Sequence, residues 1–563
     1  MATIHGPDFI WEQEALSSED GARTRSFEYM EGLVLAFFVL VVTAVLGYGW
    51  MSHRLLEVDE FLSFYTDSQP TMARVVQVQL HSPISLDPPT YHLLSHLAMR
   101  VVGNTATGLR LPALLGFLMF QASVFVFVSR ISGQRSAVIA MLFPVLTITF
   151  FYAADGRPYG LLLGLYGMSL ACWQSATREL PGRLRTTALL GLAAALVLGV
   201  TSHFFGVLLL IPVCAGELAR TIKARKLDWA VVSAIGVGAA SVALVLPFQK
   251  AAAEYRIHYY STRVVWNVIP QSYAALFIPH HTLPLNQQHV YVWALGIGMV
   301  VVAIGLVSRW KARRELNHEF VALVTLGLLP VFGFLLGRFV THTTDVRYVV
   351  ATMFAATAGL GITLERALRS RMIFYACWVV LLGASANRVI GYTRGAVGSV
   401  EDLPRRFQLS PAVAAALAED PGAPIFVQSL GDFYADSYYD PDPGVRSRFA
   451  LVYSQEEELG WLGHDTNYLT ARNMTHFAPL RIVRYRDLLS GSAHPLVLQY
   501  RDGWDWLARD LEARHVGSRS IGALAGGELV QLQLDEEAPG QTAKAGTDVQ
   551  VPRVAGNSGA VVK

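Results

Sequence analysis

Long apolar runs alternate with shorter polar connections through most of the sequence. Each run is long enough for one helix to cross the hydrocarbon core of a bilayer, which takes about 20 residues. The pattern therefore predicts a mostly α-helical, polytopic membrane protein with about eleven transmembrane helices. The runs lie near residues 31–50, 108–129, 135–153, 158–177, 186–202, 204–222, 228–247, 289–308, 319–340, 348–365 and 372–390.

Basic side chains collect in every second connection between these runs. Residues 178–185, 220–226, 309–314 and 366–371 are the most basic connections. Since cytoplasmic loops carry an excess of Lys and Arg, these connections and the N-terminal tail, residues 1–29, are predicted to be cytoplasmic. The long loops 51–107 and 248–288 of the membrane domain, residues 30–390, then face outward.

The sequence changes character after residue 390. "APIFVQSL" and "LVQLQL" are typical of strands, and "WDWLARDLEARHV" of a helix with Trp504, Leu507 and Leu511 on one stripe. Residues 391–535 are therefore predicted to form a small external α/β domain that supplies no reacting group. Its segment "DFYADSYYDPDPG" is either a Tyr-rich packing edge or an aromatic surface on which the rings of a ligand stack. Residues 536–563 are predicted to be disordered.

Composition agrees with a membrane protein. Hydrophobic residues make up 53% of the chain and charged residues only 16%, whereas soluble domains have about 25% charged residues. The net charge of +2 gives no reason to expect a nucleic-acid partner. The three cysteines lie within apolar runs, with neither a disulfide framework nor a metal-ligand spacing.

The segment "RLLEVDEFLSF" (residues 54–64) follows the first apolar run and sets carboxylates beside aromatic residues. Asp59 could cap a short helix that begins at Glu60, which is a common use of Asp. The alternative is a reactive site, which needs partners on the same face of the membrane.

Such partners occur at the predicted outer ends of the spans. Four arginines lie there, against the usual bias: Arg110, Arg157, Arg338 and Arg347. Each alone could anchor a helix or pair with a carboxylate, but together they indicate a site for an anion, since guanidinium groups bind phosphate in bidentate fashion. The other polar or aromatic candidates on this face are Asp87, His92, Asp155, His203 and Tyr348.

The histidines give little support for a metal site. His92 and His96 are four residues apart, which can place two ligands on one helix face, but no third ligand accompanies them. Packing at the interface is the favoured interpretation for this pair. His203, which ends a span beside two phenylalanines, is the better candidate for the anion site.

The order of these motifs resembles a known superfamily. "VDE", "DPPTYHLLSHLAMRVVG", "LRLP", "GRPYGLLL", "SHFFGVLLL" and "RYVVA" follow one another as in GT-C membrane glycosyltransferases. More narrowly, the sequence is similar to family 39 protein O-mannosyltransferases and their bacterial relatives that use polyprenyl-phosphate sugars. The resemblance covers roughly residues 30–390. It departs from the family at Asp87, where members often have His, and it leaves the C-terminal domain unexplained.

The resemblance implies a function and a site. Asp59, with Glu60 beside it, would be the general base of an inverting glycosyl transfer from a polyprenyl-monophosphate sugar to a protein, lipid or glycan acceptor. Arg110 and Arg347 would hold the donor phosphate. The resemblance also implies a bacterial cytoplasmic membrane protein. Further donor-phosphate contacts are assigned to Tyr348, Arg157 and His203, and loop or acceptor contacts to Asp87, His92 and Asp155.

The predicted reaction needs no cofactor, and two other functions compete with it. An arginine-stabilised phosphate leaving group does not require a metal, so neither a metal nor another cofactor is predicted, although the sequence leaves dependence on a divalent ion open. A polymerase or ligase of surface polysaccharide would use a diphosphate-linked donor and would not need the Asp-Glu loop. A secondary transporter would place its charges at mid-bilayer instead of at outer helix ends.

Overall fold

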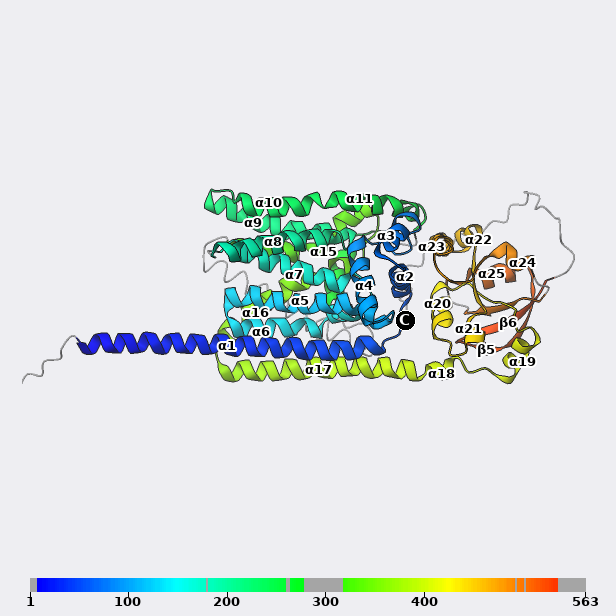
Figure 1. The fold of residues 1–563 in the computed structure, drawn as a ribbon, viewed down its shortest axis with the longest axis horizontal. Helices are drawn as coiled ribbons and strands as arrows, with labels where there is room; N and C mark the ends of the chain where they lie inside the picture. The colour runs from blue at the N-terminus through cyan, green and yellow to red at the C-terminus, as the bar shows by residue number, and fades with distance from the viewer. Residues whose placement is uncertain are drawn as a thin grey trace, which may run out of the picture.

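The computed structural model describes residues 8–178, 181–259, 264–277, 317–491, 494–500 and 503–534. They form a long helical body with a smaller sheet-containing domain at one end (Figure 1). The predicted span 289–308, the basic connection 309–314 and the predicted disordered tail 536–563 lie outside the described residues.

The helices of the body run side by side along its length (Figure 1). Helices α5 and α7 form its centre, where Gly116 and Gly164 let the two backbones touch, because a Cβ on either glycine would collide with the other helix. In the described part of the chain, the α-helices of the body outside loop 51–107 are α1 (Asp8–His53), α5 (Ala106–Ser132), α6 (Gln134–Leu142), α7 (Tyr159–Ala176), α8 (Gly182–Val200), α9 (Leu210–Ala224), α10 (Trp229–Ala240), α11 (Val242–Ala251), α12 (Val268–Phe277), α14 (His318–Gly327), α15 (Leu329–Leu336), α16 (Thr352–Leu368) and α17 (Arg371–Glu401).

Several spans contain or end in short segments of other helix types. The 3₁₀ and π turns are η1 (Phe143–Leu146), η2 (Ile148–Ala154), η3 (Phe204–Leu209), η4 (Ala252–Arg256), η5 (Gly337–Thr341) and η6 (Val346–Val349). Six helices of the described residues are long and apolar enough to cross a membrane, or eight if each of two bent pairs is one span. The predicted polytopic helical fold is confirmed, whereas the count of eleven spans stays a prediction.

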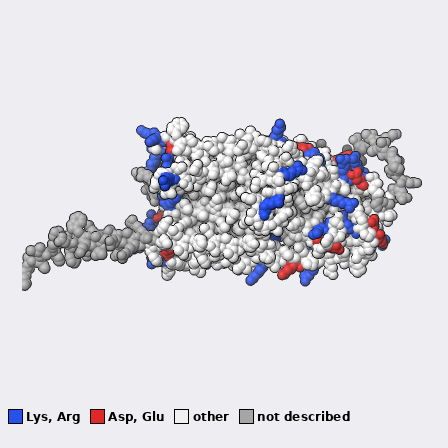
Figure 2. All heavy atoms as spheres, viewed as in Figure 1, with Lys and Arg blue, Asp and Glu red and all other residues white. Residues whose placement is uncertain are grey.

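Charged side chains are unevenly distributed on the face of the helical body seen in Figure 2. The face seen in Figure 2 has a band without Lys, Arg, Asp or Glu between one end of the body and the half that carries the C-terminal domain. Such a band fits the apolar interior of a bilayer, in which unpaired charges are costly.

Loop 51–107 folds into three helices at the end of the body that faces the C-terminal domain (Figure 1). They are α2 (Val58–Asp67), α3 (Met72–His81) and α4 (Pro89–Val102). Helix α2 begins one residue after Glu57, whose backbone N–H donates to the Glu60 carboxylate over 3.0 Å. Asp59 therefore lies in the first turn of α2 and does not cap a helix beginning at Glu60.

The C-terminal domain contains one six-stranded sheet with the strand order β3-β2-β1-β4-β6-β5. Strands β3, β2, β1 and β4 are parallel, and β6 pairs antiparallel with both β4 and β5. The elements are α18 (Leu403–Arg406), α19 (Pro411–Glu419), β1 (Ile425–Val427), α20 (Leu430–Tyr439), α21 (Pro443–Arg446), β2 (Phe449–Tyr453), α22 (Gln455–Leu462), α23 (Thr466–Met474), β3 (Ile482–Arg484), α24 (Tyr485–Leu489), β4 (Leu496–Gln499), α25 (Trp506–Ala513), β5 (Gly517–Leu524) and β6 (Gly527–Gln533).

The predicted α/β character of this domain is confirmed, but one residue of its helix stripe was wrong. Trp504 precedes α25 and is 45% exposed, while Trp506 is 1% exposed and packs with Leu507 and Leu511. The helix begins two residues later than the stripe requires, because Asp505 caps it by accepting from the Ala508 N–H.

Loop 51–107 and the C-terminal domain share one hydrophobic core. Phe61 of α2 lies 5.5 Å from the ring of Tyr434 in α20, and both side chains are buried. The Leu56 N–H donates to the Tyr439 hydroxyl over 2.7 Å. This Tyr-rich segment is thus a packing edge, which was the first of its two predicted interpretations.

Candidate active site

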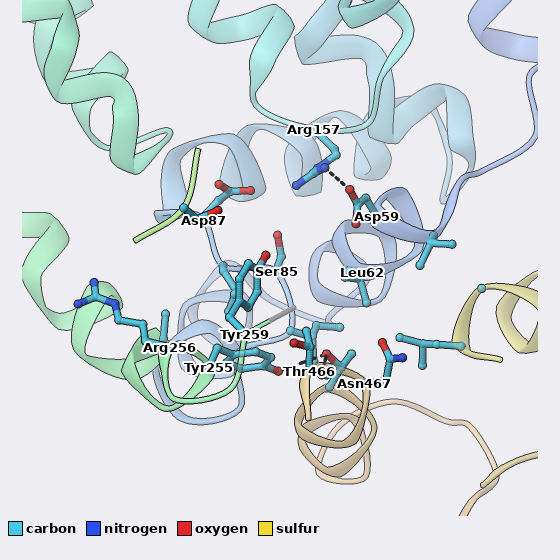
Figure 3. A pocket seen from close by; sticks show the side chains of 18 of the residues that line it. Asp59, Leu62, Ser85, Asp87, Arg157, Tyr255, Arg256, Tyr259, Thr466 and Asn467 are labelled. Atoms are coloured by element: carbon cyan, nitrogen blue, oxygen red, sulfur yellow. Dashed lines mark hydrogen bonds and ion pairs between the residues drawn. The ribbon is translucent and has the colours of Figure 1, made fainter. Parts of the chain in front are cut away.

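A cavity of about 1020 Å³ lies where the helical body meets the C-terminal domain (Figure 3). Both parts of the chain supply walls. The body contributes loop 51–107, the turns around Arg157, His203 and Arg347, and η4; the domain contributes residues 428–432 together with Gly463, Thr466, Asn467, Thr470 and Trp504.

Asp59 lies in this cavity between two arginines. Arg157 and Arg347 each donate from Nη1 to Asp59 Oδ2, the latter over 3.0 Å, and the first of these ion pairs is drawn in Figure 3. Asp59 comes from α2, Arg157 from the turn between η2 and α7, and Arg347 from η6. Fold geometry therefore brings together three predicted site residues from distant parts of the sequence.

The arginines determine the protonation of Asp59. Desolvation alone would raise the pKa of the Asp59 carboxyl, but Arg157 and then Arg347 outweigh it and hold that pKa below its ordinary value. The side chain of Asp59 is 39% exposed, so it remains open to the cavity. Asp59 is consequently an accessible carboxylate at neutral pH.

Two tyrosines support the arginines from behind. The guanidinium carbons of Arg157 and Arg347 lie 5.1 and 5.6 Å from the ring centre of Tyr159, and that of Arg347 lies 5.8 Å from the ring of Tyr348. These contacts restrict both guanidinium groups without using their N–H donors. The donors can therefore serve a second anion besides Asp59.

Glu60 and Arg110 are completely buried beside the cavity and do not line it. Arg110 donates from Nε and Nη2 to the two Glu60 oxygens over 2.7 and 2.6 Å. Its other three N–H groups donate to the backbone carbonyls of Met51, Arg54 and Leu55. All five donors are used, so this geometry favours a structural role for Arg110 over the predicted contact with phosphate.

Glu60 holds the loop from the other side of this ion pair. Its Oε1 also accepts from the Gly156 N–H over 2.6 Å. Burial raises the pKa of Glu60, but Arg110 and Arg54 dominate and lower it to about 2. Glu60 therefore remains ionised and connects α2, which carries Asp59, to the turn that carries Arg157.

A second polar pair lines the cavity, consisting of Asp87 and His203. Their Oδ1 and Nε2 atoms are 3.4 Å apart. Nδ1 of His203 accepts from the Phe205 N–H, and burial lowers the pKa of His203 to about 4. A neutral ring that accepts at Nδ1 carries its proton on Nε2, which faces Asp87.

Other predicted site residues lie away from the cavity. His92 Nδ1 is 2.6 Å from Asp67 Oδ1, and His96 Nδ1 is 2.8 Å from the Asp67 carbonyl, so the pair packs loop helices together. Asp155 is buried, and burial and Glu60 raise its pKa to about 7. Arg338 is exposed on η5. In the described part of the chain, no group of three or more His, Cys, Asp or Glu could hold a metal.

Sequence reasoning missed the wall that the C-terminal domain contributes. Gln428, Asn467 and Trp504 line the cavity, but an isolated amide or Trp carries no motif. The available signal was the position of Gln428 within the predicted strand segment "APIFVQSL", of which the structure forms a strand only over Ile425–Val427. That signal becomes useful only when the order of the strands is known.

The sequence matches no known family model and no curated protein. Its fold is similar to the crystal structure of ArnT from Cupriavidus metallidurans bound to undecaprenyl phosphate, with a TM-score of 0.53 and 14% identity over 89% of this chain and 97% of that one. AglB from Archaeoglobus fulgidus, in complex with an inhibitory peptide and a dolichol-phosphate, gives a TM-score of 0.43 at 10% identity over 82% and 69%, which is too low to support a conclusion. The likeness to ArnT shows that the two chains share a fold, which agrees with the resemblance of the sequence to the GT-C superfamily. The narrower resemblance to family 39 stays a prediction.

Proposed function

We propose that this protein is an inverting membrane glycosyltransferase that moves a sugar from a polyprenyl monophosphate to a hydroxyl group on an external acceptor. The observation that carries the proposal is Asp59, an exposed carboxylate held by Arg157 and Arg347 in a large cavity at the end of a GT-C helical body. The similar ArnT structure contains undecaprenyl phosphate, which supports a donor of this lipid class.

The two arginines would bind the donor phosphate. Each has several N–H donors, and a phosphodiester offers oxygens that accept such bonds in bidentate geometry. Because Arg157 and Arg347 already carry an anion, Asp59, the phosphate would share them with that carboxylate. Sharing weakens the hold on Asp59 and raises its pKa toward a value at which it accepts a proton more readily.

The reaction then needs one base and one stabilised leaving group. The acceptor oxygen attacks the anomeric carbon while its proton passes to Asp59. The bond between that carbon and the phosphate oxygen breaks, and its electron pair stays on the polyprenyl phosphate, which the arginines stabilise. A positioned base of this kind contributes about 10²–10⁴ in rate. A single displacement inverts the anomeric carbon.

Glu60 and Arg110 would position the base without touching substrate. Their ion pair fixes the first turn of α2 to the end of α1 and to the Gly156 turn. A transporter is disfavoured because the cavity lies at the end of the helical body and has the C-terminal domain as one wall. A polymerase using a diphosphate-linked donor remains the competing enzyme class.

Transfer by purified protein in lipid nanodiscs tests the proposal. Donors would be undecaprenyl monophosphate and diphosphate carrying radiolabelled hexoses or pentoses, and membrane extracts would supply acceptors. We expect transfer from a monophosphate donor and at least about a 100-fold loss in Asp59→Asn, with donor binding retained. The control is Asp402→Asn, since Asp402 is exposed and lies outside the cavity. Near-normal turnover by Asp59→Asn would contradict the assignment, and transfer from the diphosphate donor alone would favour the polymerase.

A further inference from the structure

The wall of the cavity that the C-terminal domain supplies lies at the carboxyl ends of its parallel strands. After β1 the chain proceeds to β2 and β3 on one side, whereas β4 pairs with β1 on the other side. The connections that leave β1 and β4 therefore diverge, which opens a crevice between them. In open α/β sheets, ligands bind in the crevice at such a switch point.

Residues from both sides of this crevice reach the cavity. Gln428 and the segment up to Asp432 follow β1, and Trp504 follows β4. The first amides of α20, which begins at Leu430, have no partner within the helix. Gly431 lets this helix end approach α2, since a Cβ there would lie 2.5 Å from Val58 Cγ2. The crevice thus opens toward the same space as Asp59.

Gln428 indicates, independently of the strand order, that this crevice binds a ligand. Its side chain is only 4% exposed, and its Oε1 has no hydrogen-bond partner among the described residues. A buried acceptor without a partner costs about 1–3 kcal/mol. A ligand that donates a hydrogen bond to this oxygen would remove that cost, and Gln428 already lines the cavity.

The charges of the two cavity walls differ. The arginines that hold Asp59 come from the helical body, while the domain wall offers the amide of Gln428, the ring of Trp504 and the carboxylate of Asp432. Asp432 accepts from the Ser429 hydroxyl over 2.6 Å. A carboxylate disfavours a phosphate on this side. It accepts hydrogen bonds from hydroxyl groups, and an amide both accepts from hydroxyl groups and donates to them. An aromatic face covers the apolar C–H side of a ring.

From these contacts we propose that the crevice between β1 and β4 binds a neutral, hydroxyl-rich sugar ring, with Gln428 and Trp504 as its principal contacts. The cavity volume of about 1020 Å³ lies at the upper end of the range for drug-sized sites, roughly 300–1,000 Å³, so it has room for this ring beside a phosphate. The inference rests on the proposed function only in naming that ring as the sugar given or received in the transfer.

Binding of simple glycosides to the full-length protein in nanodiscs tests the site without any turnover. The probes are methyl α-D-mannopyranoside and methyl α-D-glucopyranoside, followed by saturation-transfer NMR, and undecaprenyl phosphate, followed by calorimetry. We expect Gln428→Ala and Trp504→Ala each to weaken glycoside binding by about 5–10-fold, the value of one lost hydrogen bond or ring contact. The affinity for undecaprenyl phosphate should not change.

Matched controls come from the same domain. Trp461 is 39% exposed, Gln499 is buried, and neither lines the cavity, so Trp461→Ala and Gln499→Ala should leave glycoside binding intact. If Gln428→Ala does not fold, Gln428→Met, which keeps the length of the side chain, replaces it. Wild-type protein that binds neither glycoside, or Gln428 and Trp504 variants that bind both as well as wild type, would overturn the proposal.

A second arm identifies the source of the sugar. If the crevice holds the donor sugar, undecaprenyl-phosphate mannose binds wild type more tightly than undecaprenyl phosphate does, and Trp504→Ala removes that gain. If it holds an acceptor sugar, the variant keeps any such gain and loses only glycoside binding. Asp59→Asn should bind glycosides normally, so loss of transfer in that variant and loss of glycoside binding are separate results.

Discussion

Replacing Arg110 separates a structural role from a role in binding phosphate. In Arg110→Ala, Glu60 becomes a buried carboxylate without its main partner, and removing one member of a buried ion pair costs about 3–5 kcal/mol. The carbonyls of Met51, Arg54 and Leu55 also lose their donor. Together with the cost of the unpaired Glu60, the loss of these hydrogen bonds should lower the free energy of unfolding by at least about 4 kcal/mol.

Arg110→Lys is the more informative variant because it should fold. Lysine keeps the charge but has three donors instead of five and cannot form the bidentate pair with Glu60. We expect it to lower the unfolding midpoint of the detergent-solubilised protein, measured by tryptophan fluorescence, less than Ala does. The affinity of the folded fraction for undecaprenyl phosphate should equal that of wild type, because Arg110 does not line the cavity.

A double variant and a surface control complete this test. Glu60→Leu combined with Arg110→Met removes both charges and should recover part of the stability that Arg110→Ala loses. Arg100→Ala, at an exposed arginine of α4, should cost little. A large loss of undecaprenyl phosphate affinity in stable Arg110→Lys protein would refute this reasoning and would restore Arg110 as a phosphate ligand.

Three further results are expected. First, the acid limb of kcat/KM should lie below the pH at which an ordinary Asp carboxyl titrates, because Arg157 and Arg347 lower the pKa of Asp59 in the free enzyme. The acid limb of kcat should lie at higher pH because bound phosphate shares those arginines, and coincident limbs would contradict that sharing. Second, ending the chain at Leu403 should give aggregated protein by size-exclusion chromatography, because Phe61 loses the core that it shares with the C-terminal domain; a monodisperse membrane domain would show that this core is dispensable. Third, burial raises the pKa of Asp436 to about 7 despite the Tyr500 hydrogen bond. Since this value is above that of the unfolded chain, Asp436 should lower stability as the pH rises from about 4 to about 7. Asp155, whose pKa is raised similarly, contributes in the same direction, so Asp436→Asn should weaken the dependence in thermal denaturation, and an unchanged dependence would contradict the raised pKa of Asp436.

Sequence reasoning was most effective where membrane sidedness restricted the answer. Asp59, in an external loop, was grouped with Arg157 and Arg347, at outer span ends, because all three were predicted on the outer side of the membrane, and the structure places them in contact. A membrane confines such residues to one thin layer, so that residues far apart in sequence can still be assigned to one site. The same argument grouped Arg110 with them, although its side chain points into the protein.

Sequence reasoning could not supply the properties that need coordinates. Whether an arginine such as Arg110 faces a cavity or a buried carboxylate depends on helix rotation, which a motif does not specify. The shift from Trp504 to Trp506 in the helix stripe reflects a cap at Asp505 that competes with hydrophobic periodicity. Gln428 became a candidate only through the strand order, since β1 and β4 are neighbours in the sheet but far apart in the sequence.

The core that loop 51–107 shares with the C-terminal domain has a consequence for biosynthesis. Leu56 and its partner Tyr439 are 383 residues apart. Ribosomes add about 5–20 residues per second, so roughly 20–80 s pass between the emergence of these two residues. Throughout that time Phe61 and its neighbours lack their partners, and the loop that is made first is completed last. A nascent or prematurely terminated chain thus has Asp59 but lacks the cavity wall that the C-terminal domain supplies.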